Sequence, residues 1–233
     1  MSFDPYYMGS WVYDIFVEPF MTPIRRLSIK ILREKLMVAS GARVLEVACG
    51  TGTQSSFLAR EGFDVVALDK SYQMIKQAHR KKRAVSSLKL TTICGDASNM
   101  PFMSSVFDVV VLQLGLHEMK IKVRDRSAKE LKRVASEKAI FMIVDFIPPK
   151  KFNFSNFILS MVELAAGIDH FRNGRNFLKA GGLLQFLDST GLKALTTYSF
   201  FQGNICLIAA CKKEYYGTTL TQFLHYKDEG CSL

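Results

Sequence analysis

The stretch VLEVACGTGTQSSFLAREGFDVVALDKS, residues 44–71, contains the strongest sequence signal for the fold. It contains two short apolar runs, residues 44–48 and 64–68, which are separated by a glycine-bearing turn and a short amphipathic segment. Runs of this length and composition are typical of strands that are buried on both faces. The stretch therefore predicts a strand, a turn, a helix and a second strand parallel to the first.

The same alternation continues along the chain. Further strands are expected at residues 88–94, 107–114 and 138–146, and helices at residues 54–60, 73–83 and 123–135. Residues 192–213 predict two more strands around Gln202 and Gly203, which would form a hairpin at the sheet edge. The sequence thus predicts an α/β fold: a doubly wound, mostly parallel, seven-stranded sheet with an antiparallel C-terminal hairpin. A ligand should bind beyond the carboxyl ends of the strands.

The length of 233 residues suits one domain with additions. We expect a single domain, 1–233, that consists of an N-terminal helical cover (1–38, with two helices), a ligand-binding core (40–146), a helical insertion with the last helix (147–190), an edge hairpin (191–213) and a tail (214–233). Within the insertion, an aromatic-rich helix, a polar turn and a second helix ending near Gly191 are expected.

Composition and charge limit the partners and the cellular location that the sequence predicts. The formal net charge of +10 and the pI of 9.4 suggest two acidic partners, a nucleic acid or an anionic membrane surface, although solvated helix faces also explain the basic residues. The N-terminus does not have the pattern of a secretory signal, and no apolar run has the length of a membrane span. Five cysteines without CxxC spacing predict buried free thiols. A soluble cytoplasmic protein of unknown oligomeric state is expected.

Small and acidic residues at the predicted strand ends indicate the ligand. Gly50 and Gly52 lie in the first turn, and Asp69 ends the second strand, where a carboxylate can accept hydrogen bonds from a ribose diol. The dinucleotide pattern GxGxxG fails, because Ser55 occupies its third glycine position. Together with Glu46 and Asp96, these residues favour a cationic adenosyl ligand such as S-adenosylmethionine.

Four segments in order, VLEVACGTG, VVALDKSYQMI, CGDASNMPF and FDVVVLQLGLHEM, resemble the motifs of class I S-adenosylmethionine-dependent methyltransferases. The resemblance covers about residues 40–146 and is closest to the ubiquinone/menaquinone methyltransferase-like (methyltransferase type 11) branch. It implies that S-adenosylmethionine is the cofactor and assigns a set of cofactor-binding residues. These are Glu46, Ala48, Gly50 and Gly52 in the loop, Asp69 at the ribose, Asp96 and Ala97 at the adenine, Gln113 at the methionine part or methyl group, and Lys70 as a further cofactor-binding residue.

The departures from the family pattern concern the acceptor. Ala48 occupies a position where this family most often has glycine. GLHEM replaces the Arg-Asn pair of the quinone enzymes, and VASEKA replaces the usual glycine turn before the fifth predicted strand, residues 138–146. We therefore expect a small, hydrophobic or aromatic acceptor that is quinol-, phenol- or lipid-like, rather than the housekeeping quinone reaction itself. Aromatic residues of the insertion (Phe152, Phe154, Phe157 and Phe171, with Met161) are either an apolar wall over the pocket or plain core.

Methyl transfer needs few catalytic groups, because the sulfonium is already activated and a base is required only if the acceptor loses a proton. His117, just after the fourth predicted strand (residues 107–114), is the candidate base, and Glu118 is a weaker candidate. The alternative is that His117 only packs the loop. His170 and Arg172 face either the acceptor or solvent in a turn. No metal ligand is predicted.

Two other functions stay open from the sequence. An RNA or tRNA methyltransferase would suit the basic charge, but the segment after strand four has neither the Pro-Pro-aromatic motif of base-amine enzymes nor the Pro-Cys motif of cytosine enzymes. A non-catalytic S-adenosylmethionine-binding module is the second alternative.

Overall fold

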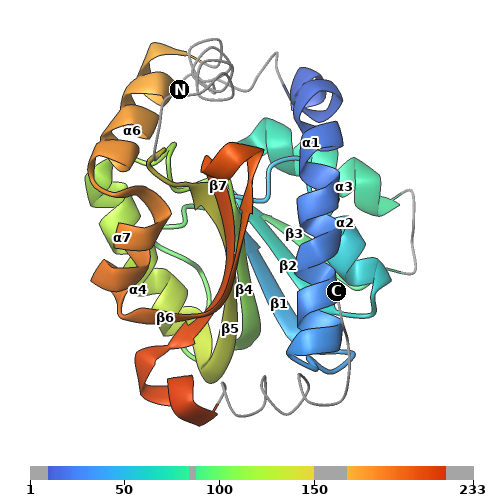
Figure 1. Cartoon of the computed structure of the whole chain (residues 1–233). Coiled ribbons are helices and arrows are strands. Elements are labelled where there is room, and N and C mark those ends of the chain that lie inside the picture. The colour runs from blue at the N-terminus through green and yellow to red at the C-terminus, as the bar shows by residue number, and fades with distance from the viewer. Residues whose placement is uncertain (1–9, 84–87, 150–166, 219–233) are drawn as a thin grey trace.

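The computed structural model describes residues 10–83, 88–149 and 167–218, and its centre is a seven-stranded sheet of order β3-β2-β1-β4-β5-β7-β6 (Figure 1). The strands are β1 (Arg43–Val47), β2 (Asp64–Asp69), β3 (Leu90–Cys94), β4 (Phe107–Gln113), β5 (Ala135–Phe146), β6 (Leu192–Phe200) and β7 (Ile205–Lys212). All pairings among the first five strands are parallel, and β7 is antiparallel to β5 and β6. The predicted doubly wound sheet with its edge hairpin is confirmed.

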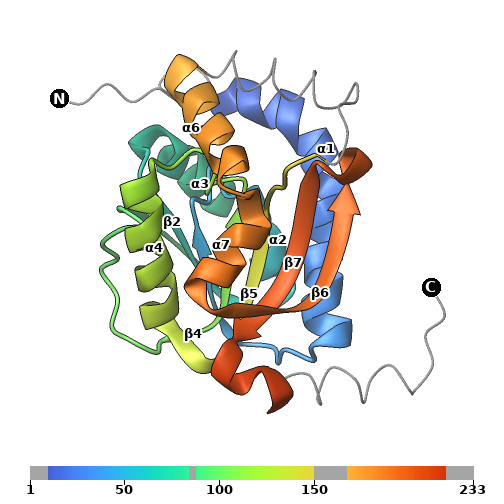
Figure 2. The same ribbon diagram turned by 60° about the vertical axis from the view of Figure 1, so that its left-hand side comes forward.

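Helices cover both faces of the sheet. They are α1 (Ser10–Lys30), α2 (Thr53–Arg60), α3 (Tyr72–Arg83), α4 (Ile121–Val134), α6 (Ile168–Lys179) and α7 (Gly182–Thr190). Figure 1 shows α1, α2 and α3 on one side and α4, α6 and α7 on the other. Figure 2 shows α6 above the carboxyl ends of the parallel strands. Because the connections leave β1 and β4 toward opposite faces, a crevice is expected between the carboxyl ends of these two neighbouring strands.

The core explains why these strands lie at the centre. In β4, residues 109–112 form the apolar run VVVL, and each of these side chains is at most 1% exposed. Neighbouring strands β1 and β5 bury Leu45 and Met142 completely. Each fully buried side chain of this size contributes about 1.5–3 kcal/mol. The buried central strands therefore form a rigid support for the loops at their carboxyl ends.

The N-terminal prediction of two helices is wrong. Helix α1 runs through both Pro19 and Pro23, and it continues directly into a π-helical turn, Ile31–Lys35. Proline removes a backbone donor from a helix. Pro19 and Pro23 thus leave the carbonyl oxygens of residues 15 and 19 without their helical donors. Helix α1 nevertheless continues through both prolines without a break.

Three other features of the structure differ clearly from the predictions. The polar segment 168–175, expected as a turn or loop, lies within α6. Strand β5 begins at Ala135 rather than at residue 138, because Ala135 pairs with Phe107 before a register shift. The thiol of Cys94 is exposed, whereas Cys49, Cys206 and Cys211 are buried as predicted. Phe152, Phe154, Phe157, Met161 and Cys231 lie outside the described residues.

Among the described residues, no helix is long and apolar enough to cross a membrane.

Candidate functional site

The loop between β1 and α2 has a left-handed backbone at three residues. The φ angles are 54° at Ala48, 54° at Gly50 and 73° at Gly52. A Cβ atom added to Gly50 would meet nothing within 4 Å, whereas one added to Gly52 would lie 2.7 Å from the Ala78 Cβ. The backbone of Gly50 therefore lies beside open space that a ligand can enter, and Gly52 is required for packing against α3.

Asp69 joins this loop to the end of β2. One carboxylate oxygen accepts a hydrogen bond from the Gly50 backbone N–H at 2.8 Å, and the other accepts one from the Ser71 N–H at 2.8 Å. A carboxylate has about four acceptor positions, so it can also accept from a ligand. Asp69 thus fixes the loop and presents its carboxylate at the same edge of the sheet.

Asp96 and Ala97 follow the neighbouring strand β3, which pairs with β2 up to Asp69. Burial raises the pKa of Asp96. The hydrogen bonds from Ser98 and the charge of Lys70 together lower this pKa by more, so it lies below its ordinary value. The Lys70 Nζ is 3.4 Å from the Asp96 carboxylate. Asp96 is therefore ionised at neutral pH.

The segment after β4 contacts the loop after β1. Gln113 is buried, and its Nε2 lies 3.4 Å from the Ser28 Oγ of α1. Leu114 has a left-handed backbone, with φ of 55°. A Cβ atom added to Gly115 would lie 2.7 Å from the Ala48 Cβ. The two loops therefore pack directly against each other at the carboxyl ends of β1 and β4.

A buried pair, His117 and Asp145, lies at the carboxyl ends of β4 and β5. The His117 Nδ1 is 2.7 Å from an Asp145 carboxylate oxygen, and the two side chains are 3% and 0% exposed. Asp145 also accepts backbone N–H groups from Leu116 and Phe146, each at 2.8 Å. An acceptor surrounded by donors requires that Nδ1 donate its proton, so the lone pair of a neutral ring lies on Nε2.

This geometry can be compared with known proteins. Residues 44–138 match the family described as methyltransferase domain, and the matched region includes every loop described above except Asp145 and its flanks. Residues 44–138 are therefore a methyltransferase domain, in a chain that has the fold of class I methyltransferases. The cofactor of this domain is S-adenosylmethionine, as the motif resemblance implied.

Two curated relatives and one solved structure are similar to this methyltransferase domain. A demethylmenaquinone methyltransferase from Thermobifida fusca is 35% identical over 107 residues, which cover 46% of this chain and 44% of that one. An uncharacterized methyltransferase from Synechocystis is 28% identical over 178 residues, covering 70% and 82%. A SAM-dependent methyltransferase from Aquifex aeolicus has the same fold, with a TM-score of 0.56, 17% identity, and coverage of 90% and 98%.

The chain spans about half the length of the demethylmenaquinone methyltransferases that it matches. These relatives belong to the ubiquinone/menaquinone methyltransferase-like branch, which is the branch that the sequence motifs resembled.

The residues of the methyltransferase domain fit an adenosyl cofactor with a charged amino-acid end. Several buried polar atoms have no hydrogen-bond partner among the described residues: both amide atoms of Gln54, Oε1 of Gln113, Nε of Arg25 and Oε1 of Glu18. Buried polar groups are normally paired, so such atoms near a ligand crevice indicate groups that a ligand satisfies. The open backbone of Gly50 and the carboxylates of Asp69 and Asp96 supply the remaining polar contacts.

Glu46 is buried inside β1 of the methyltransferase domain, where it accepts a hydrogen bond from the Ser55 hydroxyl. Burial raises the pKa of Glu46 from 4.5 to about 7, against the opposing effects of the Ser55 hydrogen bond and the Arg25 charge. Between these two pH values the folded protein binds more protons at this site than the unfolded chain does. The free energy of unfolding therefore falls as the pH rises from about 4.5 to 7.

We expect Glu46→Gln to remove this pH dependence. A difference of about 2.5 pKa units corresponds to roughly 3 kcal/mol, so the ligand-free variant should be more stable than the wild type by up to that amount at pH 8. At pH 4 the two proteins should have similar stability. Urea unfolding of both proteins at the two pH values measures the effect, and an equal difference at both pH values would contradict it.

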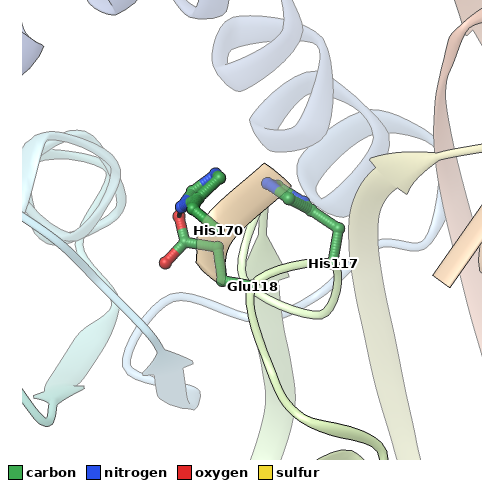
Figure 3. Close-up of side chains that lie close together, drawn as sticks. All are labelled: His117, Glu118 and His170. Carbon is green, nitrogen blue, oxygen red and sulfur yellow. Dashed lines mark ion pairs between the residues drawn. The ribbon is translucent and has the colours of Figure 1, made fainter. Parts of the chain in front are cut away.

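Glu118 and His170, which the sequence presented as weaker candidates, lie beside His117. Figure 3 shows the Glu118 carboxylate against His170, with the His117 ring turned toward this pair. Arg172 lies apart from them: its side chain is 68% exposed and approaches Asp169 of the same helix. His117, Glu118 and His170 thus form one cluster, called the histidine cluster below, and Arg172 is excluded from it.

Several basic residues that sequence reasoning assigned to solvated helix faces hold the site instead. The Lys81 ammonium donates to the hydroxyls of Thr51 and Thr53, at 2.8 and 2.7 Å, and so fixes the start of α2. Arg124 is buried, and it donates to the carbonyl oxygens of Leu116 and Met119, at 2.9 and 2.8 Å. Part of the basic charge therefore serves the architecture of the methyltransferase domain.

Asp145 is the functional candidate that sequence reasoning missed. It lies near the end of the apolar run AIFMIVDF, which predicted only a buried strand. An acid inside such a run was the available signal, because a buried carboxylate requires donors nearby.

Proposed function

We propose that this chain transfers a methyl group from S-adenosylmethionine to a small, hydrophobic or aromatic acceptor that is quinol-, phenol- or lipid-like. The observation that carries the proposal is the buried His117–Asp145 pair, placed on a segment that contacts the cofactor loop through Gly115 and Ala48. The similar protein from Thermobifida fusca is a demethylmenaquinone methyltransferase, which supports an acceptor of this class. The whole chain is proposed to act as a single methyltransferase domain.

The binding roles follow from where the polar groups lie. Asp69 is proposed to accept the ribose hydroxyls, and Asp96 with Ala97 to contact the adenine, with Lys70 positioning the Asp96 carboxylate. The remaining cofactor residues would surround the methionine end: Glu46, Ala48, Gly50, Gly52 and Gln113. This division would put the methionine end between β1 and β4, where the strand order predicts a crevice.

The bound cofactor supplies a methyl group that is already activated on a sulfonium centre. His117 is proposed to accept the acceptor's proton at Nε2, because Asp145 fixes the Nδ1–H tautomer. Phe146, whose ring lies 4.4 Å from the His117 ring, covers the imidazole with an apolar surface. The chain thus has to align the acceptor, remove one proton and exclude water.

An acceptor screen tests this function. The full chain is incubated with methyl-labelled S-adenosylmethionine and quinols, phenols, lipids with a free hydroxyl, or tRNA. Label is expected in an aromatic or lipid-like small molecule, with formation of S-adenosylhomocysteine. Label in tRNA alone would overturn the acceptor class. Binding of S-adenosylhomocysteine without label in any acceptor would favour the non-catalytic module.

A further inference from the structure

The histidine cluster unites residues that are distant in the chain. His117 and Glu118 lie in the loop after β4, and His170 lies in the first turn of α6. One ligand atom from each of the three side chains lies within 4.8 Å of the others. The Glu118 carboxylate is 3.9 Å from the His170 Nδ1, and the two imidazole rings are 5.4 Å apart (Figure 3). The sequence contains no metal-ligand spacing, because α4 and β5 lie between the two histidines along the chain.

We infer that His117, Glu118 and His170 bind a divalent transition-metal ion, of the zinc or iron(II) class, with coordination positions open to the acceptor. Two imidazoles and one carboxylate form a donor set typical of catalytic zinc and of non-haem iron(II) sites. Magnesium and calcium prefer oxygen ligands, so they suit the cluster poorly.

The support behind the ligands is already present. A metal-binding histidine normally donates its other ring N–H to a carboxylate or carbonyl, which fixes its orientation. Asp145 fills this position for His117 at 2.7 Å, and the pair is almost completely buried. Nε2 is therefore the ligand atom of His117.

The two segments that carry the ligands are tied to each other. The Asn173 side-chain amide donates to the carbonyl oxygen of Glu118 at 2.9 Å, so α6 is joined to the loop one turn after His170. Arg124 holds the same loop from the α4 side. A pre-formed backbone of this kind lowers the cost of assembling a metal site.

The required adjustment is small. Ligands about 2.0–2.1 Å from a tetrahedral ion lie roughly 3.3 Å apart, so the side chains must close by about 1 Å or more from the present separation. The side chains of His170 and Glu118 are 15% and 33% exposed, which leaves them room to rotate and gives the ion a route from solvent. His117 is the fixed member.

The ion would act on the acceptor, a role that rests on the proposed function. An acceptor hydroxyl that coordinates the ion loses its proton to solvent near neutral pH. Its oxygen then forms the bond to the methyl carbon, while the carbon–sulfur bond breaks and its electron pair stays on sulfur. With an ion bound, His117 contributes by holding the metal; without one, it takes the proton directly.

Metal titration tests the site without relying on turnover. The full chain, made without a histidine tag and stripped with a chelator, is titrated with Zn²⁺ by calorimetry and with Co²⁺ by visible absorption. One equivalent should bind. His170→Ala and Glu118→Gln should each weaken binding at least 10-fold, and Asp145→Asn about 10- to 100-fold.

Two matched controls address other metal ligands. His79 on α3 is exposed and distant in the chain from the cluster, and Cys94 is an exposed thiol. His79→Ala and Cys94→Ser should leave the affinity unchanged, and thermal unfolding should show that each variant is folded. Loss of binding in Cys94→Ser, or unchanged binding in both cluster variants, would overturn the metal site.

Titration with S-adenosylhomocysteine separates this inference from the proposed function. A stripped protein that binds S-adenosylhomocysteine and methylates its acceptor at the full rate, with no response to Zn²⁺ or Co²⁺, would remove the metal and keep the methyltransferase. Metal binding without any affinity for S-adenosylhomocysteine would remove the proposed function and keep the metal site.

Discussion

Asp69→Ala is expected to weaken S-adenosylhomocysteine binding at least about 100-fold. The carboxylate lies at the end of β2 and already accepts the Gly50 N–H, so it is fixed where it can receive both ribose hydroxyls. A hydrogen bond to a charged group is worth about 1.5–3 kcal/mol, and two of them amount to roughly 3–6 kcal/mol. Since each 1.4 kcal/mol is about tenfold, the expected loss is large. Isothermal titration calorimetry measures it.

Asp64 offers the matched control for this measurement. It is the first residue of β2 and is exposed at the opposite end of the strand. Asp64→Ala should therefore bind S-adenosylhomocysteine like the wild type. Asp69→Asn, which keeps an oxygen for the Gly50 N–H, should retain the loop and still lose affinity. Equal affinities in Asp69→Ala and the wild type would show that the ribose is held elsewhere.

Asp145→Asn is expected to reduce turnover by about 10²–10⁴-fold while S-adenosylhomocysteine affinity stays within about twofold. One Asp145 oxygen accepts from both the His117 Nδ1 and the Phe146 N–H, and the other accepts from the Leu116 N–H. An amide keeps only one oxygen. Its NH₂ group therefore either faces His117 and favours the wrong tautomer, with the proton on Nε2, or faces the Leu116 N–H and displaces the segment that carries His117. General base catalysis contributes about 10²–10⁴-fold, and either role of His117 requires the Nε2 lone pair.

His117→Ala should show the same loss of turnover with an acceptor that carries a proton. Thermal unfolding of both variants controls for damage to the buried pair. The decisive comparison is kcat against the KM of the acceptor: a misplaced lone pair lowers kcat, whereas a merely disturbed pocket raises KM. Full turnover in either variant would restrict the pair to packing.

The fold was largely predictable because its signals are local. The buried strands are short apolar runs, and Gly50, Gly52 and Asp69 lie at strand ends that the runs themselves define. Helix α1 was predicted wrongly as two helices, since proline normally ends or kinks a helix, whereas α1 continues through Pro19 and Pro23. The polar composition around His170 predicted a turn, whereas the residue lies in the first turn of α6.

The sequence could not show that the histidine cluster forms, or that Asp145 supports it, for a different reason. Asp145 reaches His117 only through the pairing of β4 with β5, in which Gln113 lies opposite Val144. His170 reaches it only through the position of α6 above the strand ends (Figure 2). Both relations depend on strand order and helix placement, which spacing along the chain does not encode.

The contact between Gly115 and Ala48 has a consequence for the evolution of acceptor choice. Any side chain larger than hydrogen at Gly115 would press on Ala48 in the loop that carries Gly50, so we expect substitution of Gly115 to disturb methyl-donor affinity. Helix α6 lies outside this constraint. Natural or engineered changes of acceptor should therefore accumulate in α6, whose variation leaves the donor half of the crevice intact.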